Sequence, residues 1–151
     1  MKKRSAQHPL LRFLFIIYCG VMLWLLFGRS VGWDSSISYE QMLLRNISTT
    51  PFYTIKNYLR VIVGRTNDAV FVHCLINLLG NIFMFIPIGF LIPKLWRKLQ
   101  SFFKFFFICL LLILTVELIQ LFALLGCCDI DDVILNMTGL TAGYIMWTIF
   151  K

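Results

Sequence analysis

Long apolar runs alternate with short polar segments along the chain. The runs cover residues 10–27, 69–92, 102–125 and 133–150. Each is close to the roughly 20 residues that an α-helix needs to cross a bilayer. Pro87 interrupts the second run near its far end and removes a backbone donor, so we expect that helix to kink or end there. The pattern predicts an all-α polytopic membrane protein with about four transmembrane helices.

The segment between the first two runs contains one further periodic stretch, residues 52–63. Apolar residues recur there on one helical face, and basic residues share the other: Ile55, Tyr58, Leu59, Ile62 and Val63 against Lys56 and Arg60. The stretch predicts an amphipathic helix outside the membrane core. It fits a helix on the outer membrane surface, or a helix that caps the bundle, and the two are compatible.

The composition agrees with a membrane protein. The chain has 151 residues, of which 60% are hydrophobic and 14% charged, whereas a soluble domain has about 25% charged residues. The net charge of +7 does not indicate a nucleic-acid partner, because the basic residues flank the apolar runs. No small-residue cleavage site follows the first run, so we expect a retained span and not a signal peptide.

The charge distribution predicts the orientation. With four spans, one side holds nine basic residues and no acidic one: Lys2, Lys3, Arg4, Arg12, Lys94, Arg97, Lys98, Lys104 and Lys151. The other side is mixed: Arg29, Arg45, Lys56, Arg60 and Arg65 with Asp34, Glu40, Asp68, Asp129, Asp131 and Asp132. The positive-inside rule then places both termini in the cytoplasm.

Several polar side chains interrupt the apolar runs at a similar depth. Glu117 lies ~12 Å from the outer end of the third run, at 1.5 Å per residue. A carboxylate in hydrocarbon costs several kcal/mol unless it is paired, hydrated or protonated. We therefore predict a polar, outward-opening pocket that binds a ligand. Its expected residues are Asn77, Asn81, Glu117, Gln120, Asp129, Asp132 and Asn136.

The helical spacing makes these predictions more specific. His73, Asn77 and Asn81 share one stripe, and Gly80 beside it could admit a neighbouring helix closely. Gly139 and Gly143 form a small-residue pair that permits tight helix packing. Glu117 is expected to face the other helices, within hydrogen-bond reach of an amide from Asn81 or Asn136.

Structural interpretations of the same residues also apply. The amides can serve as hydrogen bonds between helices. Asp129 can be the N-cap of the last helix, with Asp131 and Asp132 in its first turn. Glu117 is the hardest to explain this way, because a purely structural contact needs no ionisable group. It is the first candidate for catalysis, followed by Asp129 and Asp132.

The cysteines indicate neither a disulfide framework nor a metal site. The chain has five, and the adjacent pair Cys127 and Cys128 lacks the spacing of metal or redox motifs. They fit two small residues in a turn. We expect no metal ion and no cofactor.

Two sequence blocks carry a resemblance to a known family. The first is NLLGNIFMFIPIGF at 77–90, and the second is ELIQ at 117–120 followed by GCCDIDDVILNMTG at 126–139. At these residues the chain resembles the VanZ-like family, with a weaker similarity at 46–52. The resemblance implies one VanZ-like membrane domain over 1–151, strongest at 77–143. Gly126 departs from the pattern, since many members have arginine there. The resemblance supports a site role for Asn81 more strongly than for Asn77, which such relatives share unevenly.

The resemblance implies a function without an established reaction. Its implications are low-level resistance to teicoplanin, a lipoglycopeptide, and a place in the bacterial cytoplasmic membrane. We expect the pocket to interact with membrane lipids or with the acyl chain of the drug. The alternative is a membrane enzyme acting on an envelope lipid or lipid-linked precursor. There Glu117 would be the general acid/base, and Asp129 or Asp132 would bind a cation or headgroup.

A binding protein is favoured over an enzyme. No Ser-His-Asp order and no metal-ligand spacing can be recognised in the sequence. A third class, a structural bundle, would have no use for Glu117.

Overall fold

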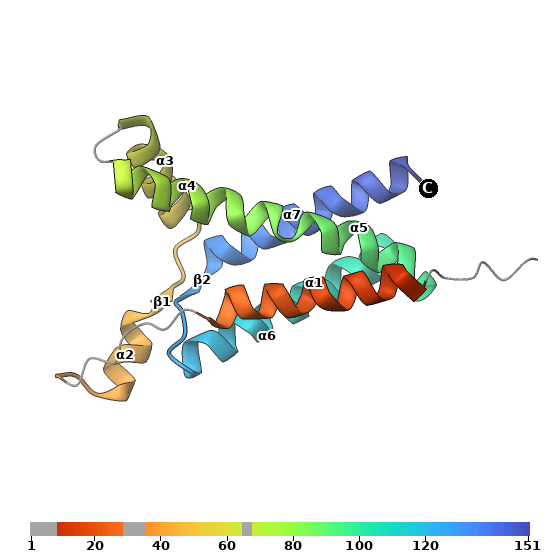
Figure 1. The fold of residues 1–151 in the computed structure, drawn as a ribbon. Coiled ribbons are helices and arrows are strands. Elements are labelled where there is room, and N and C mark those ends of the chain that lie inside the picture. Colours follow the sequence, from red (N-terminus) through yellow and green to blue (C-terminus); the bar gives the residue numbers. More distant parts are fainter. Residues whose placement is uncertain (1–8, 29–35, 65–67) are drawn as a thin grey trace, which may run out of the picture.

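The computed structural model describes residues 9–28, 36–64 and 68–151. It confirms an all-α protein (Figure 1). The helices are α1 (Pro9–Phe27), α2 (Tyr39–Arg45), α3 (Tyr53–Gly64), α4 (Asp68–Phe83), α5 (Ile86–Leu95), η1 (Arg97–Leu99), α6 (Phe102–Phe122) and α7 (Ile130–Ile149). In the described part of the chain, α1, the α4–α5 pair and α6 are long and apolar enough to cross a membrane.

Helix α7 corresponds to the fourth predicted span and is the packing centre of the bundle. It has 20 residues, with Asp131 and Asp132 in its first turn. Nine of its residues are buried, including Leu140, Tyr144 and Trp147, because it packs against α4, α5 and α6. Protein rather than lipid surrounds much of this helix, so its polar residues meet other side chains and backbone.

The second predicted span is broken where Pro87 indicated. Helix α4 ends at Phe83, a turn covers Met84 and Phe85, and Pro87 lies at the start of α5. A proline is tolerated there because the first backbone donors of a helix have no intrahelical acceptor. The second helix segment extends beyond the apolar run, which ends at 92. Helix α5 continues through Pro93 to Leu95, since a proline in the last turn removes a single hydrogen bond.

Glycines bring α7 into backbone contact with α4 and α5. A Cβ added at Gly139 would lie 2.1 Å from the carbonyl oxygen of Ile82, and one at Gly143 would lie 2.0 Å from that of Ile86. The predicted tight packing of this pair is therefore confirmed. The expectation for Gly80 is wrong, because a Cβ there would have no heavy atom within 4 Å. Gly80 faces open space and not a neighbouring helix.

Short elements join the helices at one end of the bundle. Strand β1 (Ile47–Ser48) pairs in parallel with β2 (Cys128–Asp129), Ile47 opposite Cys128. The pairing, like α2 with its Ser38–Gln41 capping box, was not predicted. Helix α3 confirms the expected helical stretch and packs against α4 and the start of α7. It thus caps the bundle, as one of the two interpretations expected.

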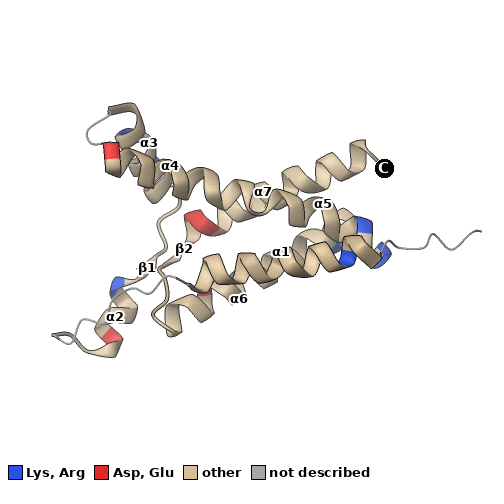
Figure 2. Cartoon of the chain, in the orientation of Figure 1, with Lys and Arg blue, Asp and Glu red and all other residues tan. Residues whose placement is uncertain are grey.

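One end of the bundle is basic, and the other is mixed in charge. The start of α1 and the end of α7 lie at the same end of the bundle (Figure 1), and the lysines and arginines at that end make it basic (Figure 2). The described ones are Arg12, Lys94, Arg97, Lys98, Lys104 and Lys151. The carboxylates lie toward the β1–β2 end (Figure 2). Lys2, Lys3, Arg4, Arg29, Asp34 and Arg65, which entered the charge count, belong to segments that the structure does not describe.

Candidate functional site

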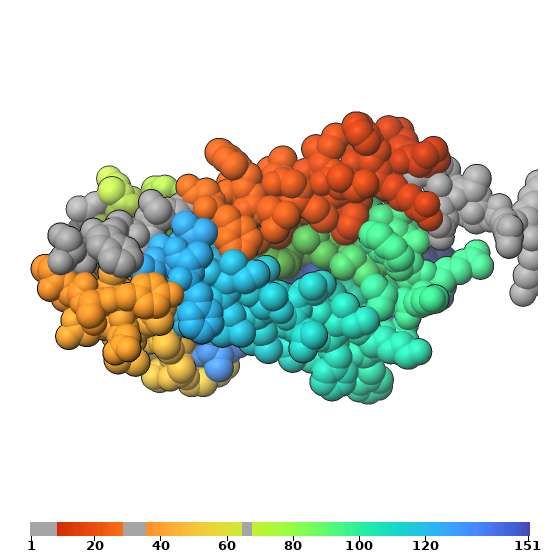
Figure 3. Space-filling view, turned by 90° about the horizontal axis from the view of Figure 1, so that it is seen from below, coloured from red at the N-terminus to blue at the C-terminus, as the bar shows by residue number. Residues whose placement is uncertain are grey.

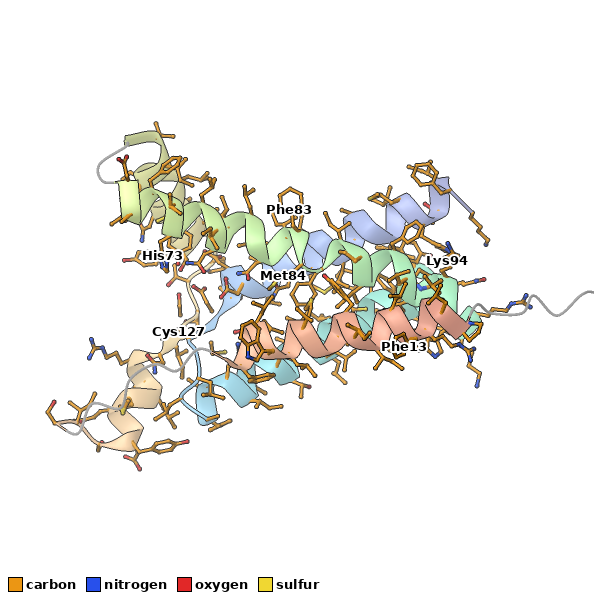
Figure 4. All side chains as sticks on the ribbon, viewed as in Figure 1. Phe13, His73, Phe83, Met84, Lys94 and Cys127 are labelled. Carbon is orange, nitrogen blue, oxygen red and sulfur yellow. The ribbon has the colours of Figure 1, made fainter. Side chains whose placement is uncertain are left out.

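A polar cavity of about 340 Å³ opens between α1, α4, α6 and α7 near the β1–β2 end. Side chains from three polar helix faces converge on it. The predicted residues in its lining are Asn77, Asn81, Glu117, Gln120, Asp132 and Asn136. Met84 also lines the cavity and points from the α4–α5 junction toward α1, whereas Phe83 points away (Figure 4). The structure thus brings six of the seven residues together; their binding of a ligand remains a prediction.

Glu117 lies deep in this cavity wall. Its side chain is 4% exposed, and five residues separate it from the end of α6, which is about 8 Å at 1.5 Å per residue. The prediction that it faces the other helices is confirmed. Its predicted amide partner is wrong: Glu117 Oε2 accepts a long bond, 3.4 Å, from the backbone N–H of Asp129. The carboxylate has further acceptor capacity that this single bond does not use.

Asp132 faces Glu117 across the cavity from the first turn of α7. Asn81 donates to its Oδ1 at 2.6 Å, which explains why Asn81 is not the partner of Glu117. Asn77 contacts His73 within α4, with 3.0 Å between Asn77 Nδ2 and His73 Nε2. His73 itself is exposed. The predicted stripe on α4 therefore reaches the cavity through its two asparagines.

The two remaining amides behave differently from one another. Gln120 donates to the backbone carbonyl of Leu26 at 2.8 Å and so ties α6 to the end of α1, as the structural interpretation expected. Asn136 is 4% exposed, and its Oδ1 has no hydrogen-bond partner within the described parts of the chain. A buried acceptor without a partner is rare in native proteins and costs about 1–3 kcal/mol. Asn136 is thus the most conspicuous unsatisfied group in the bundle.

An apolar groove of about 210 Å³ adjoins the polar cavity. Its walls come from α1 and α6 and its floor from α5 and α7, with Met22, Ile88, Ile113 and Leu140 among the lining residues. Figure 3 shows a furrow between α1 and α6 along this side of the molecule. Leu26 and Asn136 line both the cavity and the groove. The two compartments therefore meet at Asn136.

Asp129 is the one predicted residue that does not line the polar cavity, although its backbone N–H bonds to Glu117. It is 7% exposed and lines a neighbouring polar cavity of about 320 Å³, together with Arg45, Cys127 and Asp132. Burial, and then the nearby carboxylates of Asp129, Asp132 and Glu117, raise the pKa of the Cys127 thiol. The thiol donates to Asn46 Oδ1 at 3.7 Å. Both cysteines are free thiols beside the site. The expected turn is wrong for Cys128, which belongs to strand β2 and pairs with Ile47.

Asp129 and Asp131 form a structural feature that we call the clasp. Asp129 is the N-cap of α7, as predicted, with its Oδ1 accepting from Asp131 N at 2.9 Å. Its Oδ2 accepts from Thr54 Oγ1 at 2.6 Å. The Asp131 side chain is 0% exposed and accepts from the backbone N–H groups of Phe52, at 2.5 Å, and Ile55, at 3.0 Å. The clasp thereby joins the N-termini of α3 and α7.

Sequence reasoning did not identify the second role of Asp131. It placed this residue only in the first turn of α7, where an acidic side chain is favourable. The signal was present, because one N-cap does not account for three aspartates within four residues. The partner segment lies more than seventy residues away, and no periodicity links the two.

The comparison with known proteins agrees with the sequence blocks. The family model of VanZ/LLP1 matches residues 15–151. Protein VanZ of Enterococcus faecium is 31% identical over 129 residues, which cover 85% of this chain and 67% of that protein. The chain belongs to the VanZ/LLP1 family. No solved structure matches it.

The cavity of this VanZ/LLP1 member has a defined chemical character. Its described lining contains Glu117 and Asp132 but no lysine, arginine or histidine. Gly126 lines it too, and a Cβ there would meet Gln120 atoms at 3.5 Å, which is ordinary contact. Position 126 thus has space for a side chain. Within the described residues, no group of three or more His, Cys, Asp or Glu side chains could hold a metal ion.

Proposed function

We propose that this VanZ/LLP1 member confers low-level resistance to teicoplanin. In this proposal it binds a membrane lipid, or the acyl chain of the drug, and so lowers drug binding at the cell surface. The relationship to Protein VanZ supports the resistance function. The observation that carries the proposed mechanism is the junction of a polar cavity with an apolar groove at Asn136 and Leu26. A pocket with both characters suits an amphiphilic ligand.

The proposed location is the bacterial cytoplasmic membrane, with several spans and both termini in the cytoplasm. The gathering of basic side chains at one end supports this orientation. Impermeant maleimide tests it in intact cells, in a background without Cys127 and Cys128. A cysteine replacing exposed Lys56 should be labelled, and one replacing exposed Lys98 should be spared. The reverse pattern would overturn the orientation.

Drug susceptibility tests the function. The gene is expressed in a susceptible bacterium, and the inhibitory concentration of teicoplanin is measured. Glu117→Gln and Asp132→Asn should abolish protection, because each keeps side-chain shape and removes a charge from the cavity. Glu40→Gln is the matched control, since Glu40 is an exposed carboxylate near the same end of the bundle. Protection against vancomycin, which lacks the acyl chain, should be much weaker.

Protein amounts in the membrane are measured for every variant. Full teicoplanin protection by both cavity variants would refute the proposed mechanism, because resistance would then not depend on the cavity carboxylates. If a variant were less abundant, resistance would be compared with parent protein expressed at the same reduced level.

The second candidate is a membrane enzyme that modifies an envelope lipid. The observation favouring it is that Glu117 is buried beside an open cavity with a single long hydrogen bond, an arrangement available to a general acid/base. Mass spectrometry of envelope lipids distinguishes the two functions. A new lipid species that appears with the parent protein, and not with Glu117→Gln, would establish the enzyme and replace the binding mechanism.

A further inference from the structure

The polar cavity gathers two carboxyl groups without a basic side chain in its own described lining. Glu117 and Asp132 line it together, and its described lining supplies no basic side chain. Among the described residues, these carboxylates accept from one backbone N–H and one asparagine amide. Two neighbouring carboxylates repel each other, and burying them is costly without a cation. The cavity is therefore complementary to a positive charge.

The unsatisfied acceptor on Asn136 is a second, independent sign of a ligand. Its Oδ1 is buried and without a partner in the described chain, and the residue lines the cavity wall. The amide oxygen is uncharged, so repulsion between the carboxylates does not explain why it lacks a partner. It can accept a hydrogen bond from a donor on a ligand. A primary ammonium group combines positive charge with three donors, and the cavity presents three kinds of acceptor: Glu117, Asp132 and Asn136.

The adjoining groove shows what else the ligand carries. Its lining is apolar except for Asn136, and it runs from the cavity between α1 and α6. A bare metal ion or a free amine would gain nothing from such a groove. An acyl chain would bury apolar surface there, at about 25 cal/mol per Å².

We propose that the cavity and the groove form one bipartite site for a single-chain amphiphile with a cationic amine head. The ammonium group lies between Glu117 and Asp132 and donates to Asn136 Oδ1, and the chain lies in the groove along Ile113 and Leu140. The proposal rests on the proposed function and specifies its ligand. The sign of the head group follows from the charges of the cavity, and the chain follows from the groove.

Probes of equal chain length test the head group. The full-length protein is held in uncharged dodecyl maltoside micelles at pH 7, and bound probe is counted by native mass spectrometry. The probes are dodecylamine, dodecanol and dodecanoate, which differ in head-group charge. Dodecylamine should bind in a saturable 1:1 complex, dodecanol more weakly, and dodecanoate not at all. Equal binding of the three probes, or preference for dodecanoate, would overturn the cationic head.

Variants locate the site. Glu117→Gln and Asp132→Asn should each weaken dodecylamine binding roughly tenfold or more, the effect of losing one charge-assisted contact. Gly126→Arg should abolish it by placing a cation in the cavity, while Gly126→Met, of similar bulk, should retain part of it.

Gly80→Phe should fill the cavity and block binding. Gly20→Phe is its control, since a Cβ at Gly20 also meets no atom within 4 Å but the residue is exposed on α1.

A neighbouring pair on α6 tests the chain. Leu112 lines the groove and Leu111 does not, although both are exposed. Leu112→Trp should weaken dodecylamine binding, and Leu111→Trp should leave it unchanged. Butylamine should bind far more weakly than dodecylamine to the parent protein. Equal effects of the two tryptophans would overturn the assignment of the chain to the groove.

The two proposals fail in different ways. If dodecylamine binds as expected but Glu117→Gln still protects cells from teicoplanin, the cavity has no part in resistance, so the proposed resistance mechanism fails and the bipartite site stands. If protection requires Glu117 but the three probes bind equally, the cationic amphiphile is wrong and the resistance function stands.

Discussion

The clasp and the polar cavity place carboxylates in the same corner of the bundle but satisfy them to different degrees. In the clasp, Asp129 and Asp131 each accept two short hydrogen bonds from protein donors. In the cavity, Glu117 accepts one bond at 3.4 Å, and Asp132 accepts one from Asn81. Glu117 is nevertheless as deeply buried as the clasp residues. Burial alone therefore does not distinguish the carboxylates of the clasp from those of the cavity; the supply of protein donors does.

The clasp should give the largest loss of stability. Asp131→Ala leaves two partly buried N–H groups at the α3 N-terminus without this acceptor, and hydrogen bonds to a charged acceptor are worth about 1.5–3 kcal/mol each. We expect unfolding to be easier by about 3 kcal/mol or more. Thermal unfolding in detergent, followed by circular dichroism, measures it.

Asp131→Asn is the matched control, because it keeps one acceptor oxygen in place. Its loss should be smaller than that of Asp131→Ala. An alanine variant as stable as the parent protein would show that the clasp does not hold α3 and α7 together. It would also remove the contrast with the cavity.

A glycine pair compares packed and open space with the same mutation. Gly139→Ala pushes a Cβ to 2.1 Å from Ile82 O, so α7 must move and stability should fall by about 1–3 kcal/mol. Gly80→Ala meets open space and should be neutral or stabilising, because alanine favours a helix over glycine by about 1 kcal/mol. Thermal unfolding of both variants checks this. A larger loss for Gly80→Ala would mean that the cavity is closed by packing.

The cavity carboxylate should contribute little to stability. Glu117→Gln removes a buried charge and keeps the side-chain shape, so the unfolding free energy should change by less than about 1 kcal/mol or should increase. The same detergent unfolding measures it. A loss as large as that of Asp131→Ala would place Glu117 among the structural carboxylates.

The smallest expected effect is on the pKa of the Cys127 thiol, which lies beside both the clasp and the polar cavity. Burial and the neighbouring carboxylates disfavour the Cys127 thiolate and raise its pKa, so alkylation should be slow at neutral pH and should accelerate as the pH rises. In a variant without the other cysteines, Asp132→Asn should shift this profile slightly toward lower pH. The rate of iodoacetamide labelling against pH tests it. A shift toward higher pH would contradict the repulsion from Asp132.

The sequence predicted those parts of the molecule that depend on local pattern. Apolar periodicity located every long helix, Pro87 located the break before α5, and Gly139 and Gly143 indicated the close helix contact. Matched depth along three spans brought six polar residues to one cavity. These features follow from residue spacing within a helix and from the cost of polar groups in lipid.

The remaining features depend on contacts between distant segments. The pairing of β1 with β2 and the capping of α3 by Asp131 join residues more than seventy positions apart. Asn81 bonds to Asp132 and not, as expected, to Glu117. Which of the two carboxylates it reaches depends on how α4 packs against α7. Gly80 lies on a suitable helix face, yet it faces a cavity, and spacing alone does not distinguish a cavity from a packed neighbour.

The central position of α7 has a consequence for how the protein enters the membrane. A membrane-insertion machinery selects each segment largely by its own hydrophobicity, and aspartate is among the most unfavourable residues for it. Helix α7 carries Asp131, Asp132 and Asn136. Asp131 accepts from backbone N–H groups at the start of α3, and Asp132 accepts from Asn81 of α4. We therefore expect α7 to insert stably only after the preceding helices are in place. When a reporter is fused to α7 alone, we expect α7 not to insert into the bilayer. When the same reporter follows the full chain, we expect α7 to be inserted.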